Sequence, residues 1–151
     1  MLAASIRISV ARRGQPQTPA FDTFGDLLDP LIRAGQTIID PNRFVADHRL
    51  ARDAAELSYL VLRVPFIAAG VLHAQTVTAT VRREHQAFYR RVLRCGIAAE
   101  PRPYPTLIKP LSLMMVDYPA ESATVLKRYP FFAQQLRERE MFAETLGLIA
   151  S

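Results

Sequence analysis

Cysteine is almost absent from this chain of 151 residues, since Cys95 is the only one. A single cysteine excludes an internal disulfide, and the sequence has no Cys-x-x-Cys or cysteine–histidine spacing of the kind that binds zinc. The three histidines, His48, His73 and His85, are isolated, and a metal site would need two or three further ligands. We therefore expect no metal site, and a reducing, cytoplasmic environment is the simplest expectation.

A long hydrophobic run is also missing. The most apolar stretch, residues 57–72, is shorter than the ~20 residues of a membrane-spanning helix, and it contains Arg63 and Pro65. Residues 1–13 lack the order of a signal peptide, in which charged residues precede an apolar segment. The sequence therefore predicts neither a transmembrane segment nor a secretion signal.

The familiar catalytic motifs are absent too. The sequence contains no GxSxG, no Walker loop, no HExxH and no GxGxxG. Cys95 could act as a nucleophile, but no base stands beside it in the sequence, and a small apolar residue of this kind more often has a structural role. What the chain does have is the composition of one globular domain, because 50% of its residues are hydrophobic and 22% are charged.

Basic residues exceed acidic ones, 19 to 14, and the net charge of +5 favours an anionic partner. The arginines cluster around one predicted helix and at the start of another: Arg82, Arg83, Arg90, Arg91 and Arg94, then Arg49 and Arg52. They can form a plain solvated helix face, or a landing site for a phosphopantetheine carrier, a nucleotide or a nucleic acid. Nucleic acid is the least favoured partner, because no nucleic-acid motif and no interleaved aromatic residues accompany the cluster.

Hydrophobic periodicity predicts strands and helices along the whole chain. Alternation in residues 5–12 is typical of a half-buried strand. Residues 51–73 are apolar around most of the helix circumference, which predicts a buried helix with a kink at Pro65. We expect further strands at 36–46 (bent or bulged near Pro41), 76–81, 96–100 and 111–117. We expect further helices at 22–28 (capped by Asp22), 29–35, 84–94, 118–129 and 131–146. A proline hinge is expected at 101–105. This order predicts helices layered on a mixed sheet.

The helix predicted at 84–94 has two distinct faces. Phe88 and Val92, like Tyr89 and Leu93, are spaced four residues apart and are expected to face inward. The arginines of this helix, Arg90, Arg91 and Arg94, are expected to point outward.

Three blocks of this sequence carry a resemblance to a known family. The β-branched run at 76–81 followed by HQAFYRRVL at 85–93 resembles the strand 5–helix 4 block of the GCN5-related N-acetyltransferases (GNAT). Together with IDPNRFV at 39–45 and RPYP at 102–105, it is similar to the long-chain N-acyl amino acid synthases, relatives of the acyl-homoserine lactone autoinducer synthases. The resemblance covers residues 5–117.

The resemblance implies an α+β, GNAT-like acyl-transferase fold, with a mixed, mostly antiparallel sheet whose central strands are splayed and flanked by helices. The implied donor is an acyl thioester on the phosphopantetheine arm of acyl carrier protein, or acyl coenzyme A, and no cofactor is bound permanently. The implied acceptor is an amino acid or another small amine. Tyr89 would protonate the leaving thiolate, although a core tyrosine that pairs with Leu93 is the alternative interpretation. Donor-binding residues would be Phe44, Val45, Arg49, Arg52, Arg83, Arg90, Arg91 and Arg94, with the backbone N–H of Val45 or a neighbour polarising the carbonyl.

Two departures from the family pattern bear on this interpretation. The glycine-rich pyrophosphate loop is replaced by residues 48–53, HRLARD, so the usual grip on coenzyme A is not expected. The chain also begins at what would be the second strand, which predicts a single domain over 1–151 that lacks the family's first strand and helices and ends in a helical extension, 119–151. An inactive remnant, or a module that only binds a carrier protein, is therefore the alternative function.

Overall fold

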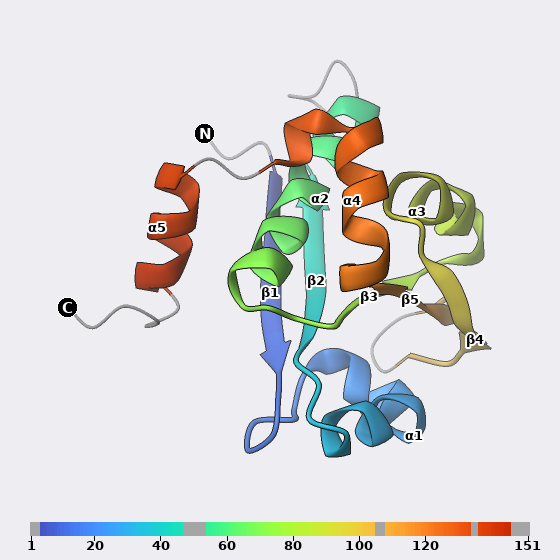
Figure 1. Ribbon diagram of the computed structural model, residues 1–151. Helices are drawn as coiled ribbons and strands as arrows, with labels where there is room; N and C mark the ends of the chain where they lie inside the picture. Colours follow the sequence, from blue (N-terminus) through green and yellow to red (C-terminus); the bar gives the residue numbers. More distant parts are fainter. Residues whose placement is uncertain (1–3, 47–53, 105–107, 134–135, 146–151) are drawn as a thin grey trace.

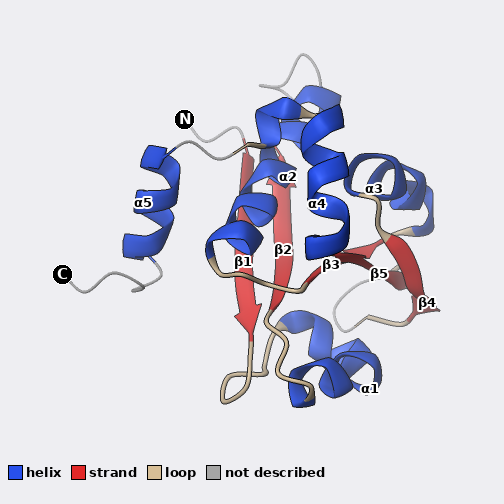
Figure 2. Ribbon diagram, in the orientation of Figure 1, coloured by secondary structure: helices blue, strands red, loops and turns tan. Residues whose placement is uncertain are grey.

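A five-stranded sheet forms the centre of the molecule, with helices on both of its faces (Figures 1 and 2). The computed structural model describes residues 4–46, 54–104, 108–133 and 136–145. Within them the strands are β1 (Ala4–Ala11), β2 (Ile38–Ala46), β3 (Thr76–Val81), β4 (Gly96–Arg102) and β5 (Leu111–Asp117). The helices are α1 (Pro19–Arg33), α2 (Ala54–Val71), α3 (Gln86–Leu93), α4 (Tyr118–Arg128) and α5 (Leu136–Thr145), with 3-10 turns at Arg83–His85 and Pro130–Phe132.

The strands lie in the order β1-β2-β3-β5-β4. Every neighbouring pair is antiparallel except β2 and β3, which run parallel and are joined by the crossover helix α2. Parallel neighbours require such a crossover, because a tight turn can only join antiparallel strands. The predicted α+β class, with a mixed and mostly antiparallel sheet, is confirmed.

Two hydrophobic layers hold the helices to the sheet. On one face, helices α2, α3 and α4 pack on residues such as Ile39, Val77 and Met114. On the other face, α1 packs on Ile38 and Leu113. Consecutive strand residues point to opposite faces, so Ile38 and Ile39 belong to different layers. The burial of α2 in this layer explains why it is apolar around most of its circumference. Buried residues occupy most of its length from Val61 onward.

The structure corrects the predicted start of the first helix. Asp22 is not its cap: α1 begins at Pro19, is kinked at Phe24, whose dihedral angles are not helical, and continues through Pro30 to Arg33. Proline is favoured at the first helical position because its missing N–H needs no partner there. The predicted end is confirmed, since Gly35 follows the helix with a φ of +87°.

The proline hinge predicted at 101–105 is wrong at its first two residues. Strand β4 continues through Pro101 to Arg102, which pairs with Leu111 of β5 across a register shift. An edge strand tolerates proline because one side of its backbone has no neighbouring strand to pair with. The strands predicted at 76–81 and 111–117 are confirmed, as is the break at Pro130. Helix α2 runs through Pro65, and the kink there stays a prediction.

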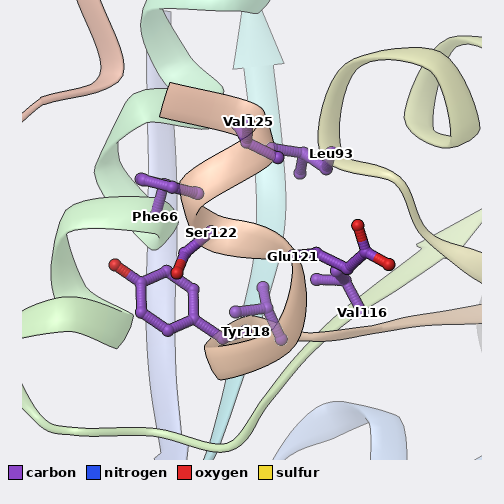
Figure 3. Close-up of a pocket in the computed structure, with 8 residues that line it drawn as sticks. Phe66, Leu93, Val116, Tyr118, Glu121, Ser122 and Val125 are labelled. Carbon is purple, nitrogen blue, oxygen red and sulfur yellow. The ribbon is translucent and has the colours of Figure 1, made fainter. Parts of the chain in front are cut away.

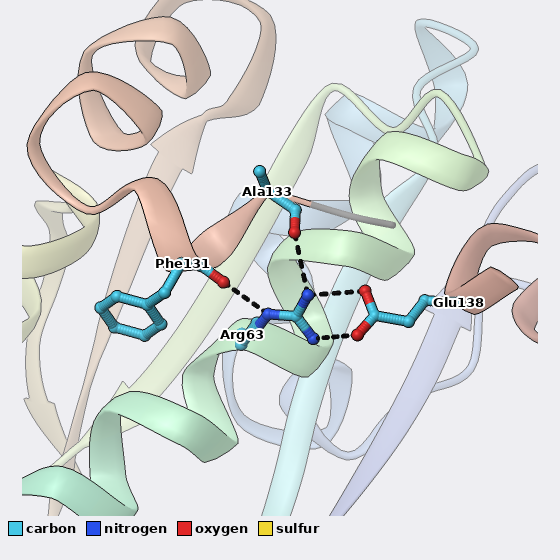
Figure 4. A network of polar contacts seen from close by, with 4 residues as sticks. All are labelled: Arg63, Phe131, Ala133 and Glu138. Carbon is cyan, nitrogen blue, oxygen red and sulfur yellow. Dashed lines mark hydrogen bonds and ion pairs between the residues drawn. The ribbon is translucent and has the colours of Figure 1, made fainter. Parts of the chain in front are cut away.

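Arg63 of α2 ties the C-terminal segment to the domain (Figure 4). Its guanidinium donates two hydrogen bonds to the Glu138 carboxylate of α5, of 2.7 and 2.6 Å. It also donates to the backbone carbonyls of Phe131, at 2.5 Å, and Ala133, at 2.8 Å. Charge-assisted bonds in this two-pronged geometry are among the strongest polar contacts that a protein makes. No helix among the described residues combines the length and apolar character needed to cross a membrane.

We predict that Arg63→Met releases α5 while the sheet stays folded. Methionine keeps the aliphatic stem and removes all four bonds, so α5 should lose about 2 kcal/mol of its attachment. Hydrogen exchange of the α5 amides measures this loss, and Arg139→Met, which removes an exposed arginine of α5, is the control. Unchanged exchange of α5 in the Arg63 variant would contradict the assignment.

Candidate functional site

Strands β2 and β3 pair briefly and then diverge. Their register contains two pairs, Ile38 with Thr76 and Ile39 with Val77. Beyond them β2 continues to Ala46 and β3 to Val81, but the ladder between the two strands does not. The outer edges of both strands stay paired, β2 with β1 and β3 with β5. We call the point of divergence, after Ile39 and Val77, the fork; beyond it two backbone edges face each other across a gap.

A β-bulge interrupts β2 beyond the fork. Against β1, Asn42 pairs with Arg7 and Val45 pairs with Ser5, so two β2 residues, at 43 and 44, stand opposite one β1 residue. A bulge turns backbone N–H groups away from the regular ladder, which makes them available to a ligand. The irregularity predicted in the middle of this strand is confirmed in β2, just after Asn42. The side chains of Phe44 and Val45, both predicted to bind the donor, lie outside the described residues.

Asp40 occupies the fork itself, a role that was not predicted from the sequence. Its side chain is buried, with 1% of the residue exposed. One carboxylate oxygen accepts the backbone N–H of Ala20 at 3.0 Å, and the other accepts the Thr78 hydroxyl at 3.0 Å. Asp40 thus caps the start of α1 from a neighbouring strand and joins β2 to β3 where they part. The available signal was the alternation, because Asp40 falls in phase with the buried Ile38.

Burial raises the pKa of Asp40, and the hydrogen bonds from Ala20 and Thr78, together with the nearby Thr18 hydroxyl, oppose that rise. The Thr18 hydroxyl lies near enough to influence the carboxylate, yet it forms no hydrogen bond of good geometry. Tyr104, from the RPYP block, donates its hydroxyl to the carbonyl of Pro19 at 3.0 Å. Burial and the nearby Asp40 raise the pKa of Tyr104. This polar cluster fixes the first turn of α1 over the fork.

The RPYP block also clamps α1 through Arg102. Its guanidinium donates to both carboxylate oxygens of Asp26, at 2.6 and 3.1 Å, and to the carbonyl of Thr23 at 3.1 Å. It also lies over the ring of Phe24, 5.2 Å from the centroid. The block therefore has a structural role in the described part of the chain.

Tyr89 lies on the inward face of α3, as predicted. It packs against the hydrophobic layer that contains Ile39 and Val77, the last pair before the fork. Its ring meets Phe88 edge to face at 5.6 Å. Burial raises the pKa of Tyr89, and the neighbouring Cys95 adds to the rise, so the phenol keeps its proton at neutral pH.

Cys95 has the properties of a structural residue. It is 2% exposed, and burial raises the pKa of its thiol to about 12. A thiol with so high a pKa holds almost no nucleophilic thiolate at neutral pH. Among the described residues, no group of three or more potential metal ligands occurs.

The arginines predicted to bind the donor differ in their surroundings. Arg90 and Arg91 are exposed in the last turn of α3, and neither forms an ion pair among the residues that the structure describes. Arg83 is exposed and lies 3.9 Å from Glu100. Arg94 is exposed too, but its guanidinium donates to Glu121 of α4 at 2.5 Å. Arg49 and Arg52 lie outside the described residues.

We predict that Asp40→Asn flattens the pH dependence of stability. Because the folded-state pKa is raised, the folded chain binds the Asp40 proton more tightly than the unfolded chain does. The contribution of Asp40 is therefore fully present below the unfolded pKa and is lost as pH rises through the folded pKa. The amide can keep both contacts, since Thr78 can turn its hydroxyl proton to the Ile39 carbonyl, 3.3 Å away.

Urea unfolding of both proteins across the weakly acidic range measures this effect. The free energy of unfolding of the parent minus that of the variant should fall as pH rises. A difference that stays constant across that range would refute a raised pKa for Asp40.

Comparison with known proteins agrees with this architecture. The family model of the N-acyl amino acid synthase FeeM matches residues 1–117. No curated protein sequence matches the chain. Among solved structures, the fold is similar to that of FeeM, an N-acyl amino acid synthase from uncultured soil microbes: the TM-score is 0.73 and the identity 18%, over 85% of this chain and 70% of that one. The fold expected from the resemblance is confirmed, and because the family model covers most of its length, the chain belongs to the FeeM family of N-acyl amino acid synthases.

Proposed function

We propose that this chain transfers a long-chain acyl group from a thioester, carried by acyl carrier protein, to the amine of an amino acid. The observation that carries the proposal is the fork between β2 and β3 with the bulge beyond it. A phosphopantetheine arm is a narrow chain with two amide groups, and it can pair with an open strand edge as a short extra strand would. The gap beyond the fork offers such an edge on each side.

The reaction needs two kinds of group from the protein, hydrogen-bond donors for an oxyanion and an acid for the leaving thiolate. The neutral amine attacks the thioester carbonyl carbon, a C–N bond forms, the C–S bond breaks, and the amine loses a proton while the thiolate gains one. The oxyanion that forms on the carbonyl oxygen needs N–H donors, and the bulge at residues 43 and 44 supplies candidates, with the N–H of Val45 next to them. The leaving thiolate needs an acid, which we assign to Tyr89. Asp40 would act by position, because both of its oxygens are already occupied.

We predict that Tyr89→Phe lowers turnover by about 10²–10⁴-fold, which is the usual contribution of a general acid. Phenylalanine keeps the ring and its packing between α3 and the sheet, so the variant should still fold and still bind the acceptor. Steady-state rates with acyl carrier protein thioester and amino acid measure the effect. Tyr129→Phe, which removes a different partly buried hydroxyl, is the control. Turnover of the Tyr89 variant at the parent rate would make Tyr89 a packing residue only.

The choice of a carrier protein as donor rests on charge and on the missing pyrophosphate loop. Residues 48–53 contain no glycine, so a close backbone wrap around a pyrophosphate is not expected there. The exposed arginines of and beside α3, namely Arg83, Arg90 and Arg91, offer a positive surface instead. Acidic helices of a carrier protein would be attracted to such a surface, mainly through faster association.

We predict that the double change Arg90→Glu and Arg91→Glu weakens carrier binding in a salt-dependent way. Each exposed contact should contribute about fivefold or less, so the double change should act most at low ionic strength and fade at high salt. Carrier affinity measured by calorimetry over a series of salt concentrations tests this. The control reverses two exposed arginines on and beside β1, Arg7 and Arg12. Equal affinity of parent and variant at low salt would remove α3 as the docking surface.

Product analysis distinguishes an enzyme from a module that only binds a carrier protein. Mass spectrometry of the reaction mixture, and of lipids from cells that express the chain, would detect N-acyl amino acids. Carrier binding without product would favour the binding module, and product formation would establish the transferase.

A further inference from the structure

Helix α3, which carries Tyr89, is too short to hold its position by itself. It has eight residues, and a helix of that length is not stable alone in water. At its start, the side-chain amide of Gln86 donates to the buried Ser112 hydroxyl of β5 at 2.6 Å. At its end it meets α4, which lies beyond the residues that the family model matches. The place of Tyr89 over the sheet therefore depends on what α3 contacts at its two ends.

Arg94 ends α3 in an unusual backbone conformation. Its φ of 58° and ψ of 32° lie in the left-handed region, which favours glycine over a residue with a side chain. Its backbone N–H donates to the Tyr89 carbonyl, and the N–H of Cys95 donates to the same oxygen at 3.4 Å. Tyr89 is thus joined through its backbone to the residue that closes the helix. An outlier of this kind points to a task for the Arg94 side chain.

The Arg94 side chain binds α4. Its guanidinium donates to the Glu121 carboxylate at 2.5 Å. The preceding residue, Leu93, lines the same small space as Glu121 and Val125 of α4 (Figure 3). Because Glu121 and Val125 are four residues apart, they lie on one face of α4. Two consecutive residues at the end of α3 therefore meet that face, Leu93 in the hydrophobic layer and Arg94 through an ion pair.

Helix α4 is itself fixed to the sheet. Asp117, the last residue of β5, caps it by accepting the backbone N–H of Ala120 at 3.1 Å. The backbone N–H of Tyr118 donates to the carbonyl of Gln75, just before β3, at 2.9 Å. The Tyr118 ring also meets Phe66 of α2 edge to face, with 5.0 Å between the centroids. An ion pair to α4 therefore holds the end of α3 in a set position relative to β3 and β5.

We propose that Glu121 is a positioning residue for Tyr89, acting through Arg94 and the end of α3. The inference rests on the proposed function, in which Tyr89 protonates the leaving thiolate. A proton donor must stay within hydrogen-bond reach of the sulfur, and a displacement of about 1 Å caused by a distant change can lower turnover about 100-fold. Helix α4 thereby supports the acid of the reaction.

The experiment reverses the charge at residue 121. Glu121→Arg replaces the ion pair by repulsion, and the double change Arg94→Glu with Glu121→Arg restores a pair with its charges exchanged. Asp29→Arg is the matched control, because it makes the same kind of change in the ion pair with Arg33 of α1, on the opposite face of the sheet. Glu121→Gln is a milder second variant, and urea unfolding verifies that each protein is folded.

Two readouts separate positioning from a purely structural role. The first is the ionisation of Tyr89, followed by the ultraviolet absorbance of tyrosinate after subtraction of the same protein with Tyr89→Phe. Burial raises the pKa of Tyr89 in the parent, so a displaced ring in Glu121→Arg should ionise at lower pH.

The second readout is turnover with dodecanoyl acyl carrier protein and a mixture of amino acids. In Glu121→Arg, kcat should fall at least about tenfold. The KM for the carrier thioester should not rise, because the added positive charge favours carrier binding. The exchanged pair should return both readouts to near the parent values, and Asp29→Arg should leave both unchanged.

The failures are distinguishable. If Tyr89 ionises as in the parent in both Glu121→Arg and Glu121→Gln, Glu121 does not position it and the inference is wrong, while the proposed function stands. If the ionisation shifts in Glu121→Arg but kcat does not, Tyr89 is not the acid, and both its proposed role and this inference are wrong. If the parent forms no product, the proposed function is wrong, and the titration alone decides whether Glu121 positions Tyr89.

Discussion

One buried carboxylate determines the geometry on which the candidate site depends. Asp40 binds the N-terminal backbone of α1 with one oxygen and the Thr78 hydroxyl of β3 with the other. Without these partners an ionised carboxylate at such depth would be costly, and with them it holds three elements at one point. The two strands pair up to this point and no further. The gap in which a thioester arm could lie therefore begins where Asp40 anchors its closed end.

The helices on the two faces of the sheet are held in different ways around that gap. On one face, α1 is held by Asp40, Arg102 and Tyr104, so it forms a fixed cover. On the other face, α2, α3 and α4 share one hydrophobic layer with the fork residues. Helix α4 lies beyond residue 117, where the family match ends, yet its Val125 belongs to the same hydrophobic layer. An ion pair between Arg94 and Glu121 also joins α4 to the end of α3.

Local patterns predicted the elements well and the contacts between them poorly. The strand at Thr76–Val81 and the inward pair Tyr89 and Leu93 followed from residue type and periodicity alone, because β-branched runs and four-residue spacing act locally. The start of α1 did not, because its cap is Asp40, twenty residues away. The strand through Pro101 did not either, because tolerance of proline depends on β4 lying at the sheet edge, which only the assembled topology reveals.

Contacts between elements also decide which basic residues stay unpaired, and therefore where the net charge of +5 is exposed. The sequence groups Arg94 with Arg90 and Arg91 as outward-facing residues and does not show which arginines form ion pairs. In the folded domain Arg63, Arg94 and Arg102 bind Glu138, Glu121 and Asp26, so their charges are neutralised locally and serve to join helices to one another and to the sheet. The positive charge that remains exposed on and beside α3 includes Arg82, Arg83, Arg90 and Arg91. An anionic partner would thus be attracted to the helix that carries Tyr89.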